Sequence, residues 1–311
     1  MMLQGHFIDT LLAIEYRDPD NIAYSTWLYF RGITAPVFFT ISGLIFTYLL
    51  IKAKEKGTLS IRIRKGLVRG LMLIGIGYAL RIPIFRWLTG KFGTYFMVID
   101  VLQCIGLSLI LIVCIYLLAR KKTLIFSVVM LCLGTLIFLC EPLFRTYSAE
   151  RIPLFFANYL TKVNGSVFTI LPWFGYMAYG AFIATLFYGY LTRPKFKTGL
   201  ITGFFVTGLI LVYGSTPVFL ELAKLTNWTL LTEVANFNYL FIRLGNVLVI
   251  FGLFYAFEAY LKQPVVLKIG QNTLSIYVIH FVLLYGSFTG LGLNQILGKI
   301  LTPFEVVFGA I

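Results

Sequence analysis

The chain opens with MMLQGHFIDTLLAI at positions 1–14 and, after an acidic loop, continues with RGITAPVFFTISG at positions 31–43. The first stretch reads as a short apolar helix that carries His6, and the second begins a long apolar span with Arg31. Ionised side chains are costly in hydrocarbon, so they usually face a protein interior or a water-filled cavity. We therefore take this hairpin as the candidate site and the rest of the chain as its scaffold.

The composition places the chain among integral membrane proteins. Hydrophobic residues make up 59%, charged residues 12%, and the mean hydropathy is +0.89. Soluble domains carry about 25% charged residues. The apolar runs are long enough to cross about 30 Å of hydrocarbon at 1.5 Å per helical residue. The ten-residue alternation of a membrane β-barrel is absent from the sequence, so we expect an all-α, polytopic transmembrane bundle.

The apolar runs predict about nine to ten spans within one membrane domain over residues 1–311. The last apolar stretch, near Thr302–Ile311, is too short to assign. The expected spans are approximately Met1–Ile14, Trp27–Leu50, Gly70–Phe85, Met97–Leu118, Thr123–Cys140, Val167–Leu191, Thr198–Val218, Tyr239–Leu261 and Leu274–Phe288.

The positive charges predict the orientation of these spans. More than half of the 26 Lys and Arg fall in four connections on one side, namely Lys52–Arg69, Arg120–Lys122, Arg193–Lys197 and Lys262–Lys268. The positive-inside bias makes these connections cytoplasmic, and it places His6 and the segment Glu141–Ser166 on the outer side. The net charge of +14 is then explained by membrane topology and requires no nucleic-acid partner.

The first apolar stretch is shorter than a complete span. Residues 1–14 reach only about 21 Å as a helix, and no basic segment marks them as a signal peptide. We expect that the native gene encodes further apolar residues upstream and that the last stretch continues beyond Ile311.

The sequence gives no support for a metal site or for nucleotide and serine-hydrolase chemistry. It has two histidines, and its four cysteines, Cys104, Cys114, Cys132 and Cys140, form no CxxC pair. We interpret them as small buried residues with free thiols and expect no bound metal. P-loop, GxGxxG and GxSxG patterns in a fitting context are missing.

Polar residues inside the spans are the remaining candidates for binding. Asp100 and Gln103 share a helix face, as do Arg243 and Asn246, so each pair could line a cavity. The structural alternatives are an interfacial Asp100 and an ion pair of Arg243 with a nearby acidic residue. Trp173 is more often a packing or interfacial aromatic residue than a ligand contact.

The two histidines have different expected roles. Tyr277 and His280 lie one turn apart, and the pair could line the same interior as His6. We favour a hydrogen-bonded structural role for His280. For His6 we favour catalysis, because Asp9 lies three residues further on and could orient the imidazole while raising its basicity.

Five motifs, in this order and spacing, resemble a known family. They are MLQGH at 2–6, the run from Arg31 through APVFF at 35–39 to Ser42-Gly43, VLQCIG at 101–106, LPWFG at 171–175, and the segment from Ile269-Gly270 through LSIY at 274–277 to His280. Together they look like bacterial relatives of heparan-α-glucosaminide N-acetyltransferase and, more distantly, of the acyltransferase-3 membrane proteins.

The resemblance implies transfer of an acyl group, usually acetyl, from cytosolic acyl-CoA to a hydroxyl or amine of a carbohydrate across the membrane. In acyltransferase-3 members a histidine near the end of the first helix is catalytic, and His6 occupies that place. The same helix there carries an Asp…Arg-Gly pattern about ten residues earlier, which this chain lacks.

The predicted mechanism uses His6 as the general base and Asp9 as the group that stabilises the imidazolium. An ordinary imidazole, with a pKa of about 6.5, is neutral enough to take the acceptor's proton. A donor such as Arg31, Gln103 or Asn246 would stabilise the oxyanion. The full set of expected donor- and substrate-binding residues is Arg31, Ser42, Asp100, Gln103, Trp173, Arg243, Asn246, Tyr277 and His280.

The expected partners follow from this reading. Acetyl-CoA serves as co-substrate without a bound cofactor, a carbohydrate or glycolipid is the acceptor, and the protein lies in the bacterial inner membrane, where a homodimer is compatible with the sequence. Two other classes stay open, a secondary transporter and a catalytically inactive sugar-binding membrane protein. A transporter should show inverted repeats, and we detect no such symmetry in the sequence.

Overall fold

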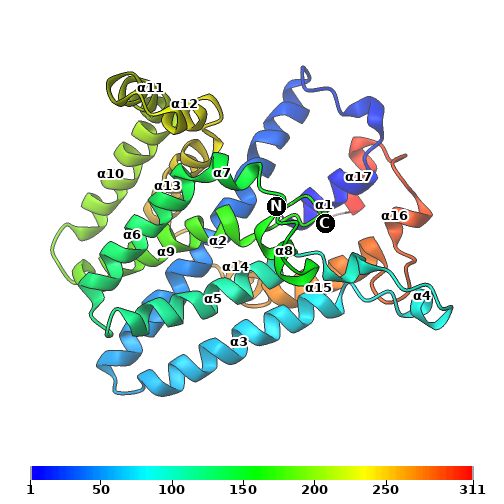
Figure 1. Cartoon of the computed structure of the whole chain (residues 1–311), viewed down its shortest axis with the longest axis horizontal. Helices are drawn as coiled ribbons and strands as arrows, with labels where there is room; N and C mark the ends of the chain where they lie inside the picture. Colours follow the sequence, from blue (N-terminus) through cyan, green and yellow to red (C-terminus); the bar gives the residue numbers. More distant parts are fainter. Residues whose placement is uncertain (1, 310–311) are drawn as a thin grey trace. The chain divides into compact units, whose positions relative to one another are not determined.

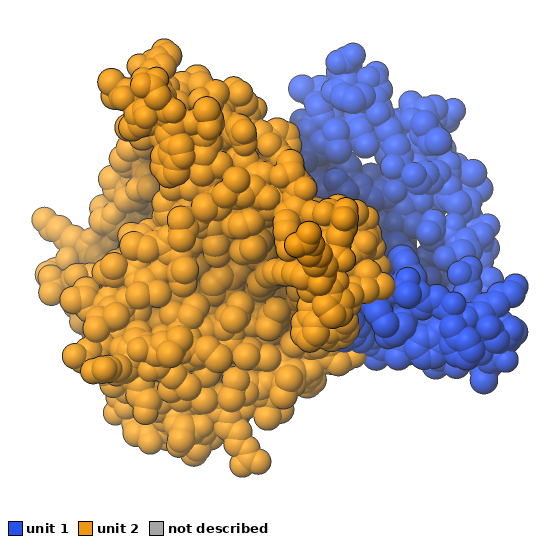
Figure 2. All heavy atoms as spheres, viewed as in Figure 1, with its two compact units in different colours: residues 1–35, 78–97, 258–311 blue, residues 36–77, 98–257 orange. Residues whose placement is uncertain are grey.

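The computed structural model describes residues 2–309 and shows a helical chain (Figure 1). Within these residues the one β-type pairing is an isolated parallel bridge between Leu12 and Leu301. The all-α fold class is therefore confirmed. The chain folds into two compact units, drawn in blue and orange in Figure 2. Unit 1 contains residues 1–35, 78–97 and 258–311, and unit 2 contains residues 36–77 and 98–257.

Unit 1 gathers the two ends of the chain around short helices. It contains the first part of α2 (Ile22–Glu55), a helix that continues into unit 2 from Pro36. The other elements of unit 1 are α1 (Met2–Leu11), η1 (Ile14–Tyr16), α4 (Ile84–Leu88), η2 (Thr94–Met97), α14 (Pro264–Gln271), α15 (Thr273–Tyr285), α16 (Leu293–Ile296) and α17 (Pro303–Gly309).

The core of unit 1 forms where α1 meets the C-terminal helices. Phe7, Leu11 and Leu12 of the first segment pack against Leu284 of α15 and Val306 of α17. The spacing of Phe7 and Leu11 places both on one helical face, as expected for neighbours four residues apart. Segments from opposite ends of the sequence therefore build one core, and α1 is held in a defined place beside α15.

The C-terminal end of α1 is closed by both side-chain and backbone hydrogen bonds. The last carbonyls of a helix have no partner within the helix. Arg17 supplies donors to them: its Nε lies 3.0 Å from Leu12 O, and its Nη2 lies 3.0 Å from Asp9 O. Two backbone hydrogen bonds also join this end to the segment at Leu301. The N–H of Ala13 donates to Leu301 O at 2.9 Å, and the N–H of Leu301 donates to Leu11 O at 3.0 Å.

Unit 2 contains the longer helices. Its elements besides the second part of α2 are α3 (Leu59–Ala79), α5 (Val101–Leu118), α6 (Thr123–Leu139), α7 (Glu141–Arg145), α8 (Leu154–Leu160), α9 (Ile170–Tyr190), α10 (Phe196–Leu209), η3 (Ile210–Gly214, a π-helical segment), α11 (Ser215–Thr226), α12 (Thr229–Asn236) and α13 (Tyr239–Ala256).

Close backbone contacts through glycine hold unit 2 together. On α9, a Cβ at Gly180 would overlap the carbonyl of Thr40 on α2, and one at Gly43 of α2 would overlap that of Met177. A Cβ at Gly70 of α3 would lie 2.8 Å from the Gly106 carbonyl oxygen on α5. Helices in membranes associate largely through such close packing of small residues. Glycine at these positions is therefore a condition of the helix arrangement.

Five helical segments within the described residues are long and apolar enough to cross a membrane, and the bent pair α14 and α15 would add a sixth. The chain is therefore a multi-pass membrane protein. The five are Ile22–Glu55, Thr94–Leu118, Ile170–Tyr190, Phe196–Thr226 and Tyr239–Ala256.

This count is below the nine to ten spans expected from the sequence, for identifiable reasons. The helix α1 has ten residues and α6 has seventeen, so both are short for a span. Only residues 70–79 of the expected span Gly70–Phe85 lie in α3, which starts at Leu59 and includes the basic residues near Arg62, and Phe85 belongs to α4. Lys and Arg favour helix nearly as well as Leu, so the basic residues from Arg62 to Arg69 lie within α3, after the short turn that separates it from α2.

The cysteines and the chain ends refine two further expectations. The four cysteines are free thiols, and Cys104 is buried as predicted. The prediction of burial is wrong for Cys114 and Cys132, which lie on outward faces of their helices. The unassigned last stretch forms α17, while Met1, Ala310 and Ile311 lie outside the described residues.

Candidate active site in unit 1

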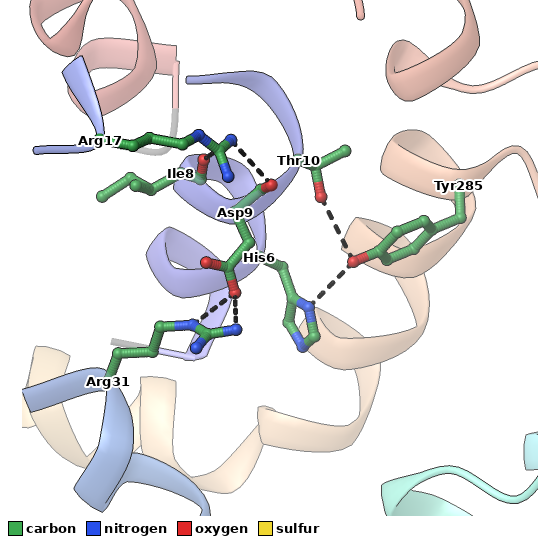
Figure 3. A network of polar contacts seen from close by, with 7 residues as sticks. All are labelled: His6, Ile8, Asp9, Thr10, Arg17, Arg31 and Tyr285. Atoms are coloured by element: carbon green, nitrogen blue, oxygen red, sulfur yellow. Dashed lines mark hydrogen bonds and ion pairs between the residues drawn. The ribbon is translucent and has the colours of Figure 1, made fainter. Parts of the chain in front are cut away.

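The candidate site is centred on His6, which α1 presents toward α15. The Nδ1 atom of His6 lies 3.1 Å from the hydroxyl oxygen of Tyr285. Figure 3 shows the two side chains pointing toward each other. The Thr10 hydroxyl, one turn further along α1, donates to the same oxygen over 3.4 Å. His6 is half-buried in this position. Tyr285 therefore fixes the direction of the imidazole ring.

A second histidine lies against the first. The ring centroids of His6 and His280 are 5.2 Å apart, and those of Tyr277 and His280 are 5.0 Å apart with the planes nearly perpendicular. His280 is only 2% exposed. The structure thus brings His6, Tyr277 and His280 together on the α15 side of α1, as the sequence spacing suggested.

The hydrogen bonds constrain which ring nitrogens carry protons. The Nδ1 atom of His280 lies 3.1 Å from the carbonyl oxygen of Ile276, which can only accept, so this nitrogen carries a proton. The Tyr285 hydroxyl can either donate to or accept from Nδ1 of His6. When it accepts, the Nε2 atom of a neutral His6 is the basic nitrogen.

The carboxylate of Asp9 is paired with Arg31 of α2. Both Nε and Nη2 of Arg31 bind Asp9 Oδ2, and Figure 3 shows this pair on a different side of α1 from Tyr285. The guanidinium of Arg31 also lies 5.7 Å from the centre of the Trp27 ring. Asp9 is thus paired with Arg31, and the hydroxyl of Tyr285 contacts the imidazole; the role of Asp9 toward His6 stays a prediction.

A small cleft adjoins the pair of Asp9 and Arg31 within unit 1. Its volume is about 220 Å³, and it is lined by Gln4, Gly5, Ile8, Trp27, Arg31, Thr34 and Val307. A Cβ at Gly5 would meet no atom within 4 Å, so this glycine leaves the helix surface open beside His6. The cleft combines an aromatic ring, a guanidinium and an apolar floor.

The remaining predicted site residues belong to unit 2, where two of them have a structural explanation. Asp100 is the N-cap of α5, and its side chain accepts from the N–H of Val101 at 2.8 Å. The Oε1 atom of Gln103 accepts from the Asp100 N–H at 3.2 Å. This is a capping box, which requires the same three-residue spacing that suggested a shared cavity.

Trp173 and Ser42 are also placed by local packing. Trp173 lies in an aromatic cluster with Phe168 and Phe39, at ring-centroid distances of 4.7 and 5.1 Å. The hydroxyl of Ser42 donates to Phe38 O, one turn back on α2, at 2.7 Å.

The last two predicted residues lie on α13. Arg243 places its guanidinium 5.0 Å from the centre of the Tyr239 ring, one turn earlier on the helix. Asn246 is half-buried, three residues further along the same helix. The predicted set thus divides between the units, with five residues in unit 1 and these six in unit 2.

Comparison with known proteins decides the family. Residues 1–221 match the family model described as heparan-alpha-glucosaminide N-acetyltransferase, catalytic. The chain belongs to this family. No curated protein and no solved structure is similar enough to the chain to give a match.

Membership of the heparan-alpha-glucosaminide N-acetyltransferase catalytic family makes the chain a membrane acetyltransferase that acts on carbohydrate. The matched residues include His6, Asp9 and Arg31, whereas His280 and Tyr285 follow the matched region. The family resemblance inferred from the sequence motifs is confirmed.

Two residues near the site were missed by sequence reasoning. Tyr285 follows Tyr277 by two helical turns, so the 3.6-residue period could have placed both on one face. Arg81 follows α3, and its guanidinium lies 5.1 Å from the ring of Tyr95 and 6.0 Å from that of Phe281. Its position at the end of an apolar helix was the available signal.

Candidate ligands for a metal ion do not converge in this site. Among residues 2–309, no three His, Cys, Asp or Glu side chains lie close enough together to hold a metal.

Proposed function

We propose that the protein transfers an acetyl group from acetyl-CoA to a hydroxyl or amine of an extracytoplasmic carbohydrate, with His6 as general base. The observation that carries this proposal is the imidazole of His6 fixed through Nδ1 by Tyr285, on a helix that belongs to the family's matched region. A general base needs a fixed ring with one basic nitrogen directed by a partner on the other.

In the proposed step the acceptor oxygen or nitrogen attacks the thioester carbonyl of acetyl-CoA. The new C–O or C–N bond forms, the C–S bond breaks, and CoA leaves as a thiolate that takes up the proton that His6 removed from the acceptor, which restores the neutral imidazole. His6 accepts the acceptor's proton at Nε2, while its Nδ1–H donates to the Tyr285 oxygen. Such proton transfer contributes about 10² to 10⁴ in rate.

The ion pair of Asp9 and Arg31 supports this role through its charge balance. A lone guanidinium near His6 would disfavour the imidazolium that forms during the reaction. The Asp9 carboxylate offsets the charge of Arg31 and leaves its outer N–H groups beside the cleft with Trp27 and Gly5. We propose that this cleft holds part of the acceptor, with the aromatic ring against an apolar sugar face.

The wider setting is proposed from the charge pattern and the family. The donor enters from the cytosol and the acceptor from outside, in the bacterial inner membrane. Cysteines introduced at Glu55 and Ser148 in a cysteine-free background test the orientation. An impermeant reagent should label intact cells at Ser148 only, and labelling at Glu55 would reverse the proposed direction.

The deciding experiment uses the purified full chain in lipid nanodiscs with acetyl-labelled acetyl-CoA and a panel of amino sugars and neutral sugars. The proposal predicts labelled sugar and CoA in equal amounts. CoA release without labelled sugar would show hydrolysis instead of transfer. Uptake of an unmodified sugar by proteoliposomes, with no labelled product, would favour the transporter alternative.

A further inference from the structure

A second cluster of charged side chains lies wholly in unit 2. It joins α7, the segment after α8 and the start of α13. The Nη1 atom of Arg145 lies 3.7 Å from Glu141 Oε2, and the hydroxyl of Tyr239 donates to Glu141 Oε1 over 3.4 Å. The side chain of Glu141 is only 8% exposed. This carboxylate is therefore already bound to a cation and a hydroxyl.

The cluster carries more positive than negative charge. Lys162 lines the same cavity as Glu141 and Arg145, and Arg243 stacks over Tyr239 at 5.0 Å. Among residues 2–309, neither Lys162 nor Arg243 has a carboxylate oxygen within 4 Å. With Glu141 balanced by Arg145, two cations remain without an ionic partner of opposite charge in this region.

The cavity between these groups has the size of a small polar group. Its volume is about 60 Å³, and its lining comprises Glu141, Phe144, Arg145, Leu160, Lys162, Thr169, Leu171, Pro172 and Tyr239. A water molecule occupies about 30 Å³ of liquid, so the space corresponds to roughly two waters. A carboxylate or sulfate head fits this volume, whereas a whole sugar ring does not.

The electrostatic surroundings of the groups that line the cavity also favour binding of an anion. Burial raises the pKa of the Glu141 carboxyl, and the charge of Arg145 opposes this shift. Removal from water lowers the pKa of the Lys162 ammonium. The charge of Glu141 opposes this shift, and that of Arg243 adds to it. The ammonium is thus incompletely compensated, and an added anion would stabilise its charged form.

We propose that this cavity is an oxyanion-binding site in which Lys162 and Arg145 hold a carboxylate, sulfate or phosphate group. Charge-assisted hydrogen bonds from both cations would bind its oxygens, and Arg243 would add attraction from behind Tyr239. The inference is independent of acetyl transfer, because it concerns binding by residues of unit 2 alone.

Calorimetric titration of the purified full chain with sodium sulfate, at constant ionic strength in an uncharged detergent, tests the site. Wild type should bind sulfate saturably, and Lys162→Gln should weaken binding by about 10- to 100-fold. Glu141→Gln should instead tighten binding by about tenfold, because it removes the one opposing charge. A gain in affinity cannot come from a damaged fold.

Lys224→Gln is the matched control, because Lys224 is 69% exposed on α11 and pairs with Glu221 at 2.7 Å. It should leave sulfate affinity unchanged. Equal affinity in wild type and Lys162→Gln, or no saturable binding of sulfate, would overturn the proposal.

Two competition arms distinguish the sources of such an anion. Displacement of sulfate by sodium glucuronate, but not by glucose, would identify an acidic saccharide. Loss of sulfate binding in nanodiscs containing phosphatidylglycerol, compared with phosphatidylcholine alone, would identify a lipid headgroup. Either result keeps the oxyanion site, and displacement by glucose as effective as that by glucuronate would contradict it.

Discussion

The polar clusters of the two units differ in how their charged groups are paired. In unit 1, Arg31 forms an ion pair with Asp9, on which the charges of Arg17 and Lys299 also act, and His6 is held by the uncharged hydroxyl of Tyr285. In unit 2, the single carboxylate of Glu141 lies among several cations, including Lys162. An imidazole held by an uncharged hydroxyl can gain and lose a proton, whereas cations without an ionic partner around a small cavity favour binding of an anion. We therefore propose proton transfer in unit 1 and anion binding in unit 2.

The two clusters also differ in how they are held. The site in unit 1 depends on side-chain contacts between short helices, such as the neighbouring, mutually tilted rings of His6 and His280. In unit 2 the helices approach through backbone, as at Gly180 against Thr40. Single substitutions in the site of unit 1 should therefore lower mainly the activity. Single substitutions at the glycine contacts of unit 2 should lower mainly the stability.

The largest expected effect comes from His6→Ala. Removal of a general base should lower the rate of acetyl transfer by about 10² to 10⁴, while sulfate binding by unit 2 stays unchanged. His280→Ala should cause a smaller or structural loss, because His280 is buried and donates to a backbone carbonyl. Turnover and sulfate affinity measured on the same preparations check both statements. Full activity of His6→Ala would remove His6 from the mechanism.

The next effect concerns the scaffold of unit 2. Gly180→Ala inserts a methyl group against the Thr40 carbonyl, and such overpacking costs about 1 to 3 kcal/mol. Gly189→Ala, on the same helix with nothing within 4 Å of the added Cβ, is the control and should be neutral or slightly stabilising. Thermal unfolding in detergent measures both. Equal melting temperatures would show that the close helix contact is not required.

The smallest effect is expected for Tyr285→Phe. Loss of a hydrogen bond worth about 1 kcal/mol should lower kcat by about fivefold and leave KM nearly unchanged, since the hydroxyl positions the base without binding substrate. Tyr95→Phe removes a hydroxyl from an exposed ring in the same unit and serves as control. A change in KM alone would instead place the Tyr285 hydroxyl in substrate binding.

The sequence predicted the fold class because composition and hydropathy determine it. The span count was less predictable: a basic segment such as the one near Arg62 lies within a helix as readily as between two helices. The spacing of Asp100 and Gln103 illustrates another limit, since one three-residue period serves both a capping box and a pair lining a cavity. Only the backbone geometry separates these two readings.

The candidate site was predictable in part. The helical period and the apolar context brought His6, Tyr277 and His280 to attention, and the structure groups them. The partners of Asp9 and His6 were not predictable, because Tyr285 is 279 residues from His6 in the chain. The cluster of Glu141 and Lys162 likewise depends on tertiary packing that no local pattern encodes.

The most direct test of the central claim is the pH dependence of kcat/KM for acetyl transfer, measured for wild type and for the residual activity of His6→Ala. We expect wild-type kcat/KM to fall as the pH is lowered, because protonation removes the general base. That acid limb should be absent in His6→Ala. A wild-type profile that is flat between about pH 5 and 8, or the same acid limb in both proteins, would contradict the assignment of His6 as general base.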